Sequence, residues 1–170
     1  MDVCPLNSTE HYREFHSIAE ASNCVRDLEI MPTFKPIDSG VSMKSSLSTL
    51  DRLVLHGHAL EADFYIAEDA NKRLRVAFPR VEITRTLDET PLSTEEPEKW
   101  VGLKAEHFAY EVVDAHFWRS QSPAFKIAVN NLMHYVFITG GACLDVISRH
   151  PPTFCIVNAP APLPKVRLGS

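Results

Sequence analysis

The sequence predicts an α+β fold, in which an antiparallel β-sheet packs against two or three helices in a single compact domain with an extended N-terminal arm. The chain has 170 residues, 45% of them apolar, and a chain of this length buries about two thirds of its unfolded surface in one core. From Val81 to Leu87 apolar and polar residues alternate, which is typical of a sheet covered on one face. From Ser122 a long apolar segment follows signals that begin a helix.

Residues 1–48 are predicted to hold one helix and an extended arm. Ser8 or Thr9 can cap a helix in which apolar residues recur at helical spacing as far as Ser22. Residues 27–48 contain Pro32, Pro36, Gly40 and five serines, a composition that favours an irregular connector or an extended arm. Residues 49–170 are predicted to form the α+β core domain, which ends in a proline-rich tail.

Three strands are expected at the start of the core domain. They cover residues 52–60, 63–67 and 74–87, and the turn at residues 68–72 joins the second to the third. Pro79 interrupts the third strand, because proline cannot donate a hydrogen bond to the ladder.

Two helices and a strand are expected in the second half of the chain. Residues 103–118 are predicted to form a helix, although a strand also fits them. The next helix begins at Ser122 as its cap, with Pro123 in the first turn, and ends at Gly140. Its last turns are apolar on every side, so a sheet or a partner must cover them. Residues 142–148 then form a strand.

Charge and composition narrow the possible functions. The chain has 22 acidic and 17 basic residues and a net charge of −5, and residues 88–98 hold five acids and no base. This balance argues against a protein that binds nucleic acid mainly through its overall charge. We also expect no sequence-specific nucleic-acid binding. No stretch reaches the roughly 20 apolar residues of a membrane span, so we expect a soluble, intracellular protein. The cysteines, without a CxxC pattern, are expected to be free thiols; they are Cys4, Cys24, Cys143 and Cys155.

A His-x-His pattern offers a candidate metal site. His56 and His58 lie on a predicted strand, where both imidazoles would share one face, and Asp63 or Glu61 follows closely enough to complete a two-histidine, one-carboxylate set. The pattern is similar to the His-x-His element of cupins, but the flanking glycines and the later strand histidine after a Pro-x-Gly turn are missing. Two partly exposed strand histidines without a metal are the alternative interpretation.

A basic segment and several aromatic residues offer candidate interaction surfaces. Five bases against one acid between residues 72 and 85 are enough for a basic stripe on one sheet face, and they are Lys72, Arg73, Arg75, Arg80 and Arg85. A solvated sheet face is the alternative interpretation. Trp100, Phe117 and Trp118 near the acidic segment are either part of an interaction surface or core anchors.

Short segments between residues 81 and 148 suggest a family. They are VEITRTLDE at 81–89, His116-Phe117, Phe125-Lys126, Leu132-Met133, Gly141-Ala142 and Leu144-Asp145-x-Ile147-Ser148. In their order and approximate spacing they resemble the C-terminal half of rhabdovirus matrix proteins, particularly the vesiculovirus type. The resemblance implies a twisted antiparallel sheet packed on helices. The chain departs from that family in its N-terminal residues, which lack a lysine-rich tail and a Pro-Pro-x-Tyr motif.

The leading hypothesis is a non-enzymatic structural protein that forms a homo-oligomer or lattice, with an extended N-terminal segment docking on the next subunit. The resemblance implies a protein that bridges nucleoprotein and membrane, in the host cytoplasm and the virion, with at most a peripheral membrane contact and no cofactor. The first alternative is a small cupin-like, metal-dependent enzyme using His56, His58 and Asp63. The second is an intracellular adaptor that binds one partner through the basic stripe or the acidic segment.

Overall fold

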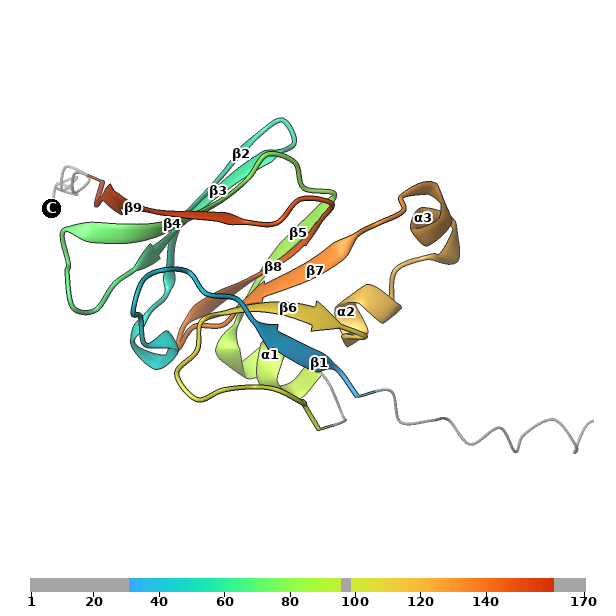
Figure 1. Ribbon diagram of the computed structural model, residues 1–170, viewed down its shortest axis with the longest axis horizontal. Coiled ribbons are helices and arrows are strands. Elements are labelled where there is room, and N and C mark those ends of the chain that lie inside the picture. The colour runs from blue at the N-terminus through green and yellow to red at the C-terminus, as the bar shows by residue number, and fades with distance from the viewer. Residues whose placement is uncertain (1–30, 96–98, 161–170) are drawn as a thin grey trace, which may run out of the picture.

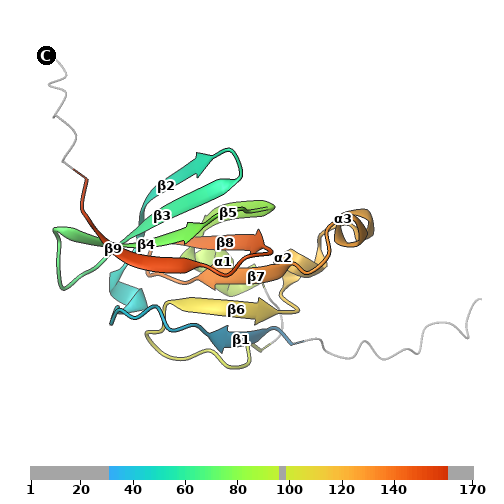
Figure 2. The same cartoon turned by 45° about the horizontal axis from the view of Figure 1, so that its top comes forward.

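The computed structural model describes residues 31–95 and 99–160, which form two antiparallel sheets and three short α-helices (Figures 1 and 2). This confirms the predicted fold class, an antiparallel sheet fold with packed helices in one compact domain. The elements are β1 (Thr33–Pro36), the 3-10 helix η1 (Ser45–Leu47), β2 (Leu50–His56), β3 (Ala59–Tyr65), β4 (Lys72–Phe78), β5 (Ile83–Asp88), α1 (Glu89–Glu95), β6 (Ala109–Val113), α2 (His116–Arg119), α3 (Pro123–Ala128), β7 (Met133–Phe137), β8 (Ala142–Ser148) and β9 (Thr153–Asn158).

The chain passes between the two sheets three times. One sheet has five strands in the order β1-β6-β7-β8-β5, and the other has four in the order β2-β3-β4-β9. The passages fall between β1 and β2, between β4 and β5, and between β8 and β9. Every pairing between neighbouring strands is antiparallel. The sequence predicted a single sheet, and its residues are instead divided between two sheets that face each other (Figure 2).

The main core lies between the two sheets. On β4 the residues alternate between buried and partly exposed, because one face of this strand packs inward and the other faces solvent. The core is built from the inward faces of both sheets and contains, among others, Leu60, Phe64, Leu74, Val76, Phe78, Tyr135, Phe137, Leu144 and Val146. Phe137 on β7 is fully buried, with its ring centroid 5.9 Å from that of Phe64 and 5.5 Å from that of Phe108.

A second cluster covers the opposite face of the five-stranded sheet. It joins Leu92 of α1 and Ala115, the residue before α2, to residues of β1, β6, β7 and β8, namely Phe34, Tyr110, Val112, Val136 and Cys143. Both faces of β7 and β8 are therefore buried, which explains why their sequences are almost continuously apolar. The helices α1 and α2 lie on this face, so the five-stranded sheet is the middle layer here, while α3 lies beyond the end of β7 (Figure 1).

The predicted helix from Ser122 to Gly140 is correct only in its first turns. Ser122 accepts a hydrogen bond from the Phe125 backbone N–H at 3.2 Å, and Pro123 begins α3, but α3 ends at Ala128. Val129, the residue after α3, has an extended backbone with φ of −124° and ψ of 96°, and Asn131 has φ of 56°, a left-handed conformation in which a helix does not continue. The apolar residues that follow form β7. This strand is buried on both faces, which accounts for the apolar residues that the predicted helix placed on all of its sides.

Residues 103–118 also differ from the predicted helix. They contain β6 and the first turn of α2, so the strand interpretation was right for Ala109–Val113. Residues 74–87 are interrupted at Pro79 as predicted, but the two halves belong to different sheets, as β4 and β5. The acidic segment at residues 88–98 contains α1.

Gly140 lies in the turn between β7 and β8 and is not a helix cap. Its backbone N–H donates to the Ser45 carbonyl at 2.8 Å. A Cβ at this position would lie 2.3 Å from the Ser46 carbonyl oxygen, so only glycine allows the turn to approach η1 this closely.

Two predictions fall outside the described residues, the helix from Ser8 or Thr9 to Ser22 and the proline-rich tail beyond residue 160. Within residues 27–48, expected as a connector or arm, Thr33–Pro36 forms β1 and pairs with β6. In the part of the chain that the structure describes, no helix has the length and apolar character needed to cross a membrane.

Candidate functional site

The structure separates the residues of the proposed metal site. His56 ends β2, and Gly57 and His58 form a two-residue hairpin turn before β3, so the two histidines do not share a strand face. Gly57 has φ of 62°, as the first central residue of a type II′ turn requires. Asp63 pairs with Arg52, four residues before His56 along β2, which corresponds to about 13 Å.

The carboxylates near this pattern bind arginines instead. Among the described residues no group of three side chains is arranged to hold a metal ion. Asp63 Oδ1 accepts from Arg75 Nε at 2.6 Å, and Asp63 Oδ2 accepts from Arg52 at 3.3 Å. Glu61 lies 3.0 Å from Arg75. Both carboxylates proposed as metal ligands therefore have cationic partners on the outer face of the four-stranded sheet.

Stability should fall in acid as Asp63 is protonated. Burial raises the pKa of Asp63, but the hydrogen bonds and charges of Arg75 and Arg52 outweigh burial and hold it below the ordinary value of 3.8. A carboxyl group with a depressed pKa stabilises the fold above its unfolded pKa, and this contribution is lost as the pH falls through the folded value. The free-energy difference between the wild type and Asp63→Asn, measured by urea unfolding, should be constant near neutral pH and shrink below pH 3.8. An unchanged difference down to the acid limit of folding would contradict this assignment.

The predicted basic stripe does not exist as one surface. Arg73 and Arg75 share the outer face of β4, but Arg85 is on β5 in the other sheet. The bases are also matched by acids: Arg73 lies 2.7 Å from Asp51, Lys72 lies 3.3 Å from Asp69, and Arg80 lies 2.9 Å from Glu82. This pattern corresponds to the solvated sheet face that was the alternative interpretation.

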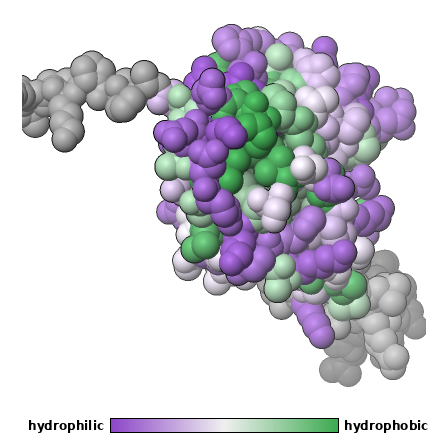
Figure 3. All heavy atoms as spheres, turned by 60° about the vertical axis from the view of Figure 1, so that its left-hand side comes forward, coloured by the Kyte–Doolittle hydropathy of each residue, from purple (hydrophilic) through white to green (hydrophobic). Residues whose placement is uncertain are grey.

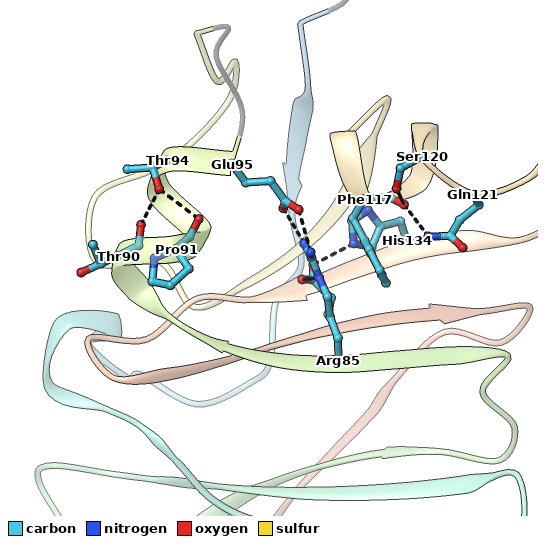
Figure 4. A network of polar contacts seen from close by, with 10 residues as sticks. Arg85, Thr90, Pro91, Thr94, Glu95, Phe117, Ser120, Gln121 and His134 are labelled. Carbon is cyan, nitrogen blue, oxygen red and sulfur yellow. Dashed lines mark hydrogen bonds and ion pairs between the residues drawn. The ribbon is translucent and has the colours of Figure 1, made fainter.

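Arg85 instead belongs to a partly buried cluster of charged and aromatic side chains (Figure 4). Its Nε donates to Asp145 Oδ2 at 2.6 Å, while its two terminal nitrogens donate to the Glu95 carboxylate at 2.6 and 2.5 Å. The guanidinium carbon lies 3.9 Å from the centroid of the Phe117 ring. Asp145 is fully buried on β8, and its Oδ1 lies 2.8 Å from His134 Nε2.

This cluster brings side chains from two strands and two helices together at one point on the sheet. Arg85 comes from β5 and Asp145 from β8, while Glu95 and Phe117 come from α1 and α2. Burial acts to lower the pKa of Arg85, but the hydrogen bonds and charges of Glu95 and Asp145 outweigh it and raise this pKa. The guanidinium therefore stays charged and fastens both helices to the sheet. The sequence segments that carry the matrix-protein resemblance supply Arg85, Phe117 and Asp145.

The two tryptophans lie apart. Trp100 stacks on Phe34 of β1 with ring centroids 4.9 Å apart and packs against the second core cluster, so it corresponds to the core-anchor interpretation. Trp118 on α2 is half-buried, contacts Phe125 edge to face, and has the Lys126 ammonium 5.2 Å from its ring centroid. Together the tryptophans do not form one aromatic surface.

The surface formed by the described residues has hollows. One, of about 450 Å³, is lined by residues 37–43 and 107–109. Another, of about 130 Å³, lies where β6 and β7 meet α2 and is lined in part by Trp118 and His134. On the side of the molecule that lies to the left in Figure 1, hydrophobic residues gather in one area surrounded by hydrophilic ones (Figure 3). The end of β9 lies on this side.

The cysteines described by the structure differ in their surroundings. Cys143 is buried on β8, where burial raises the pKa of its thiol despite contacts with Thr139. Cys155 is exposed on the outer face of β9, opposite Arg75 in the β4–β9 register. Both are free thiols, as the sequence predicted.

β9 is an edge strand with one open side. The Ala159 N–H donates to the Asn71 carbonyl at 2.7 Å, so alternation along the strand points the backbone groups of Thr153, Cys155 and Val157 toward β4. The N–H and C=O groups of Phe154, Ile156 and Asn158 point the other way. They have no backbone partner within residues 31–95 and 99–160. Ile156 is 43% exposed although it lies on the core-facing side of the strand.

Of the four edge strands that the structure describes, β9 alone lacks a protective residue. Natural edge strands are shielded from pairing by charges, prolines or bulges. β1 has Lys35 and Pro36, and β5 has Arg85 and Asp88. β2 has charged residues and an irregular register near its start. The six residues of β9, TFCIVN, have no charge and no proline. This open edge is the candidate functional site.

The strand β9 was not among the strands predicted from the sequence. Residues 153–158 contain aromatic and β-branched residues and lie between Pro152 and Pro160, which is a strand signal. Its position at a sheet edge has no local signal, because strand order follows from the tertiary fold.

The fold and the site define a class: a two-sheet antiparallel α+β domain with one unprotected edge strand. Comparison of the chain with protein-family models, with curated proteins and with solved structures finds no match.

Proposed function

We propose that the protein is a non-enzymatic structural protein that self-associates through the open edge of β9. The observation that carries this proposal is the uncharged strand whose outward N–H and C=O groups lack partners in the described chain. Pairing with another strand would satisfy these groups and cover the exposed Ile156 side chain. In the role implied by the matrix-protein resemblance, the assembly would bridge nucleoprotein and membrane.

Light scattering on the purified protein tests self-association. The mean mass should rise with concentration, and added salt should change it little, because the pairing strand has no charged residue. A mass of one chain, 19.1 kDa, at every concentration would refute the proposed function. An adaptor that binds a different partner would give that result.

Proline at position 156 should weaken association without unfolding the sheet. The Ile156 N–H points away from β4, so Ile156→Pro removes an outward donor and leaves the β4–β9 ladder intact. In a symmetric dimer two donors are lost, each contributing about 1 kcal/mol, so dimerisation should weaken by about 30-fold. The measurement is the concentration dependence of mass, with circular dichroism to confirm the fold. Ile156→Ala, which shortens the side chain but keeps the N–H, is the matched control and should associate more strongly than the proline variant.

A further inference from the structure

We propose that two copies of the chain pair antiparallel along β9 in the register that places Cys155 opposite Cys155 of the second copy. This inference rests on the proposed function and names the partner and the geometry of the same edge. The pairing joins the two four-stranded sheets into one sheet in the order β2-β3-β4-β9-β9-β4-β3-β2. Because a two-fold contact closes on itself, the dimer is the unit from which any larger assembly is built.

The second copy is the best partner because the other edges of this chain are protected. β1 is four residues long and ends in Pro36, β5 has Arg85 and Asp88, and β2 changes register between Leu50 and Arg52. Head-to-tail pairing of β9 with any of them would bring a charge, a proline or a bulge to the contact. Pairing of β9 with another β9 avoids all three.

The strand is also complementary to itself. In an antiparallel pair, core-facing residues must meet core-facing residues, which leaves two central registers. In the register centred on Cys155, Phe154 lies beside Ile156 of the second copy, and Thr153 lies beside Val157. In the register centred on Ile156, the Phe154 ring meets the Asn158 amide instead. An aromatic residue beside a β-branched residue is a stabilising cross-strand pair, so the first register is preferred.

The charges near the edge are compatible with this contact. Arg75 is the residue of β4 opposite Cys155, so the two copies of Arg75 would be three strand spacings apart, about 14 Å. This exceeds the screening length of about 8 Å at physiological ionic strength. Each Arg75 is also paired with Asp63 at 2.6 Å. Repulsion between the copies is therefore small.

The proposed register has a geometric consequence that can be measured. The backbone groups of Cys155 point toward β4, so the two Cys155 residues would form a non-hydrogen-bonded pair with Cα atoms about 4.5 Å apart. A disulfide requires a Cα separation of about 4.4–6.8 Å. The exposed thiols can therefore act as a probe of the register. Mild treatment with diamide, which takes up the two electrons and two protons of the thiols, would join them.

The experiment uses the full chain with Cys4→Ser and Cys24→Ser, so that Cys155 is the accessible thiol and Cys143 remains buried. Diamide should convert most of the protein to a disulfide-linked dimer on a non-reducing gel, and Cys155→Ser should abolish this product. With Cys155→Ser as the background, a mixture of Thr153→Cys and Val157→Cys chains should form the mixed dimer in preference to either homodimer. Ala128→Cys, an exposed position on α3, controls for random collisions and should crosslink much more slowly.

The outcomes separate the inference from the proposed function. Association by light scattering without a Cys155 crosslink, but with a crosslink through Ile156→Cys, would overturn the proposed register. Association that Ile156→Pro leaves unchanged would overturn the β9 contact while self-association stands. A single-chain mass at every concentration would overturn both.

Discussion

Replacing Phe137 with alanine is expected to lower the free energy of unfolding by about 3–5 kcal/mol, the usual cost of removing a buried phenylalanine ring. The ring is fully buried at the centre of the space between the two sheets. It contacts rings from three strands of the facing four-stranded sheet and from the segment before β6, namely Phe64, Phe78, Phe154 and Phe108. These neighbours lie on separate segments of the chain and cannot all close the cavity that alanine would leave. Urea unfolding followed by tryptophan fluorescence measures the change.

Two variants test whether the loss comes from this position in the sandwich. Phe137→Leu keeps most of the volume and should cost less than the alanine variant. Phe154→Ala removes a half-buried ring on the edge strand β9, and it should also cost less because solvent reaches this site. If Phe137→Ala and Phe154→Ala destabilised equally, the two sheets would not pack as described.

Phe137 also lies in a segment whose secondary structure the sequence alone did not determine. Leu132–Ile138 is apolar at nearly every position, and such a run fits a buried helix or a strand covered on both faces. The helix was chosen because Ser122 and Pro123 signal a helix start, and that signal was correct for α3. Asn130-Asn131 was the evidence for a break, since asparagine tolerates the left-handed conformation that Asn131 adopts. The residues that pack on the two faces of β7 are distant in sequence. No pattern near β7 in the sequence therefore indicates that both faces are buried.

The fold class was predictable because local patterns determine it. The alternation in β4 and β5, the interruption at Pro79 and the turn before Lys72 each follow from side-chain periodicity or backbone chemistry. The division of these strands between two sheets is not local. It depends on which apolar faces meet, and the sequence leaves several pairings open.

The sites were predicted less well for a related reason. The His56-Gly57-His58 pattern was interpreted as part of one strand, whereas glycine between two strand-forming segments is also a hairpin signal, and Gly57 forms the turn. The partners Arg85 and Asp145 are 60 residues apart. Only the register of β5 with β8 places them opposite each other. Neither residue's sequence neighbours indicate that pairing.

Replacing Asp145 with alanine is expected to destabilise the protein by about 3–5 kcal/mol, the range for removing one partner of a buried ion pair. Asp145 is fully buried and accepts from Arg85 at 2.6 Å and contacts His134 at 2.8 Å. Alanine would leave Arg85 with Glu95 as its remaining carboxylate and would leave His134 Nε2 without its partner. Urea unfolding at neutral pH measures the loss. Asp69→Ala, which breaks the exposed pair with Lys72, is the matched comparison and should cost less than about 1 kcal/mol.

A double-mutant cycle separates the cost of the missing ion pair from the cost of the missing side chain. Arg85→Ala, Asp145→Ala and the double variant should give a coupling energy of about 0.5–3 kcal/mol, because residues in direct contact are not additive. The double variant should then be more stable than the sum of the single losses predicts, since no charge is left facing a lost partner. Additive losses would mean that the two side chains stabilise the sheet independently. In that case the attachment of α1 and α2 would depend on apolar packing around Leu92 and Phe117 rather than on the Arg85 guanidinium.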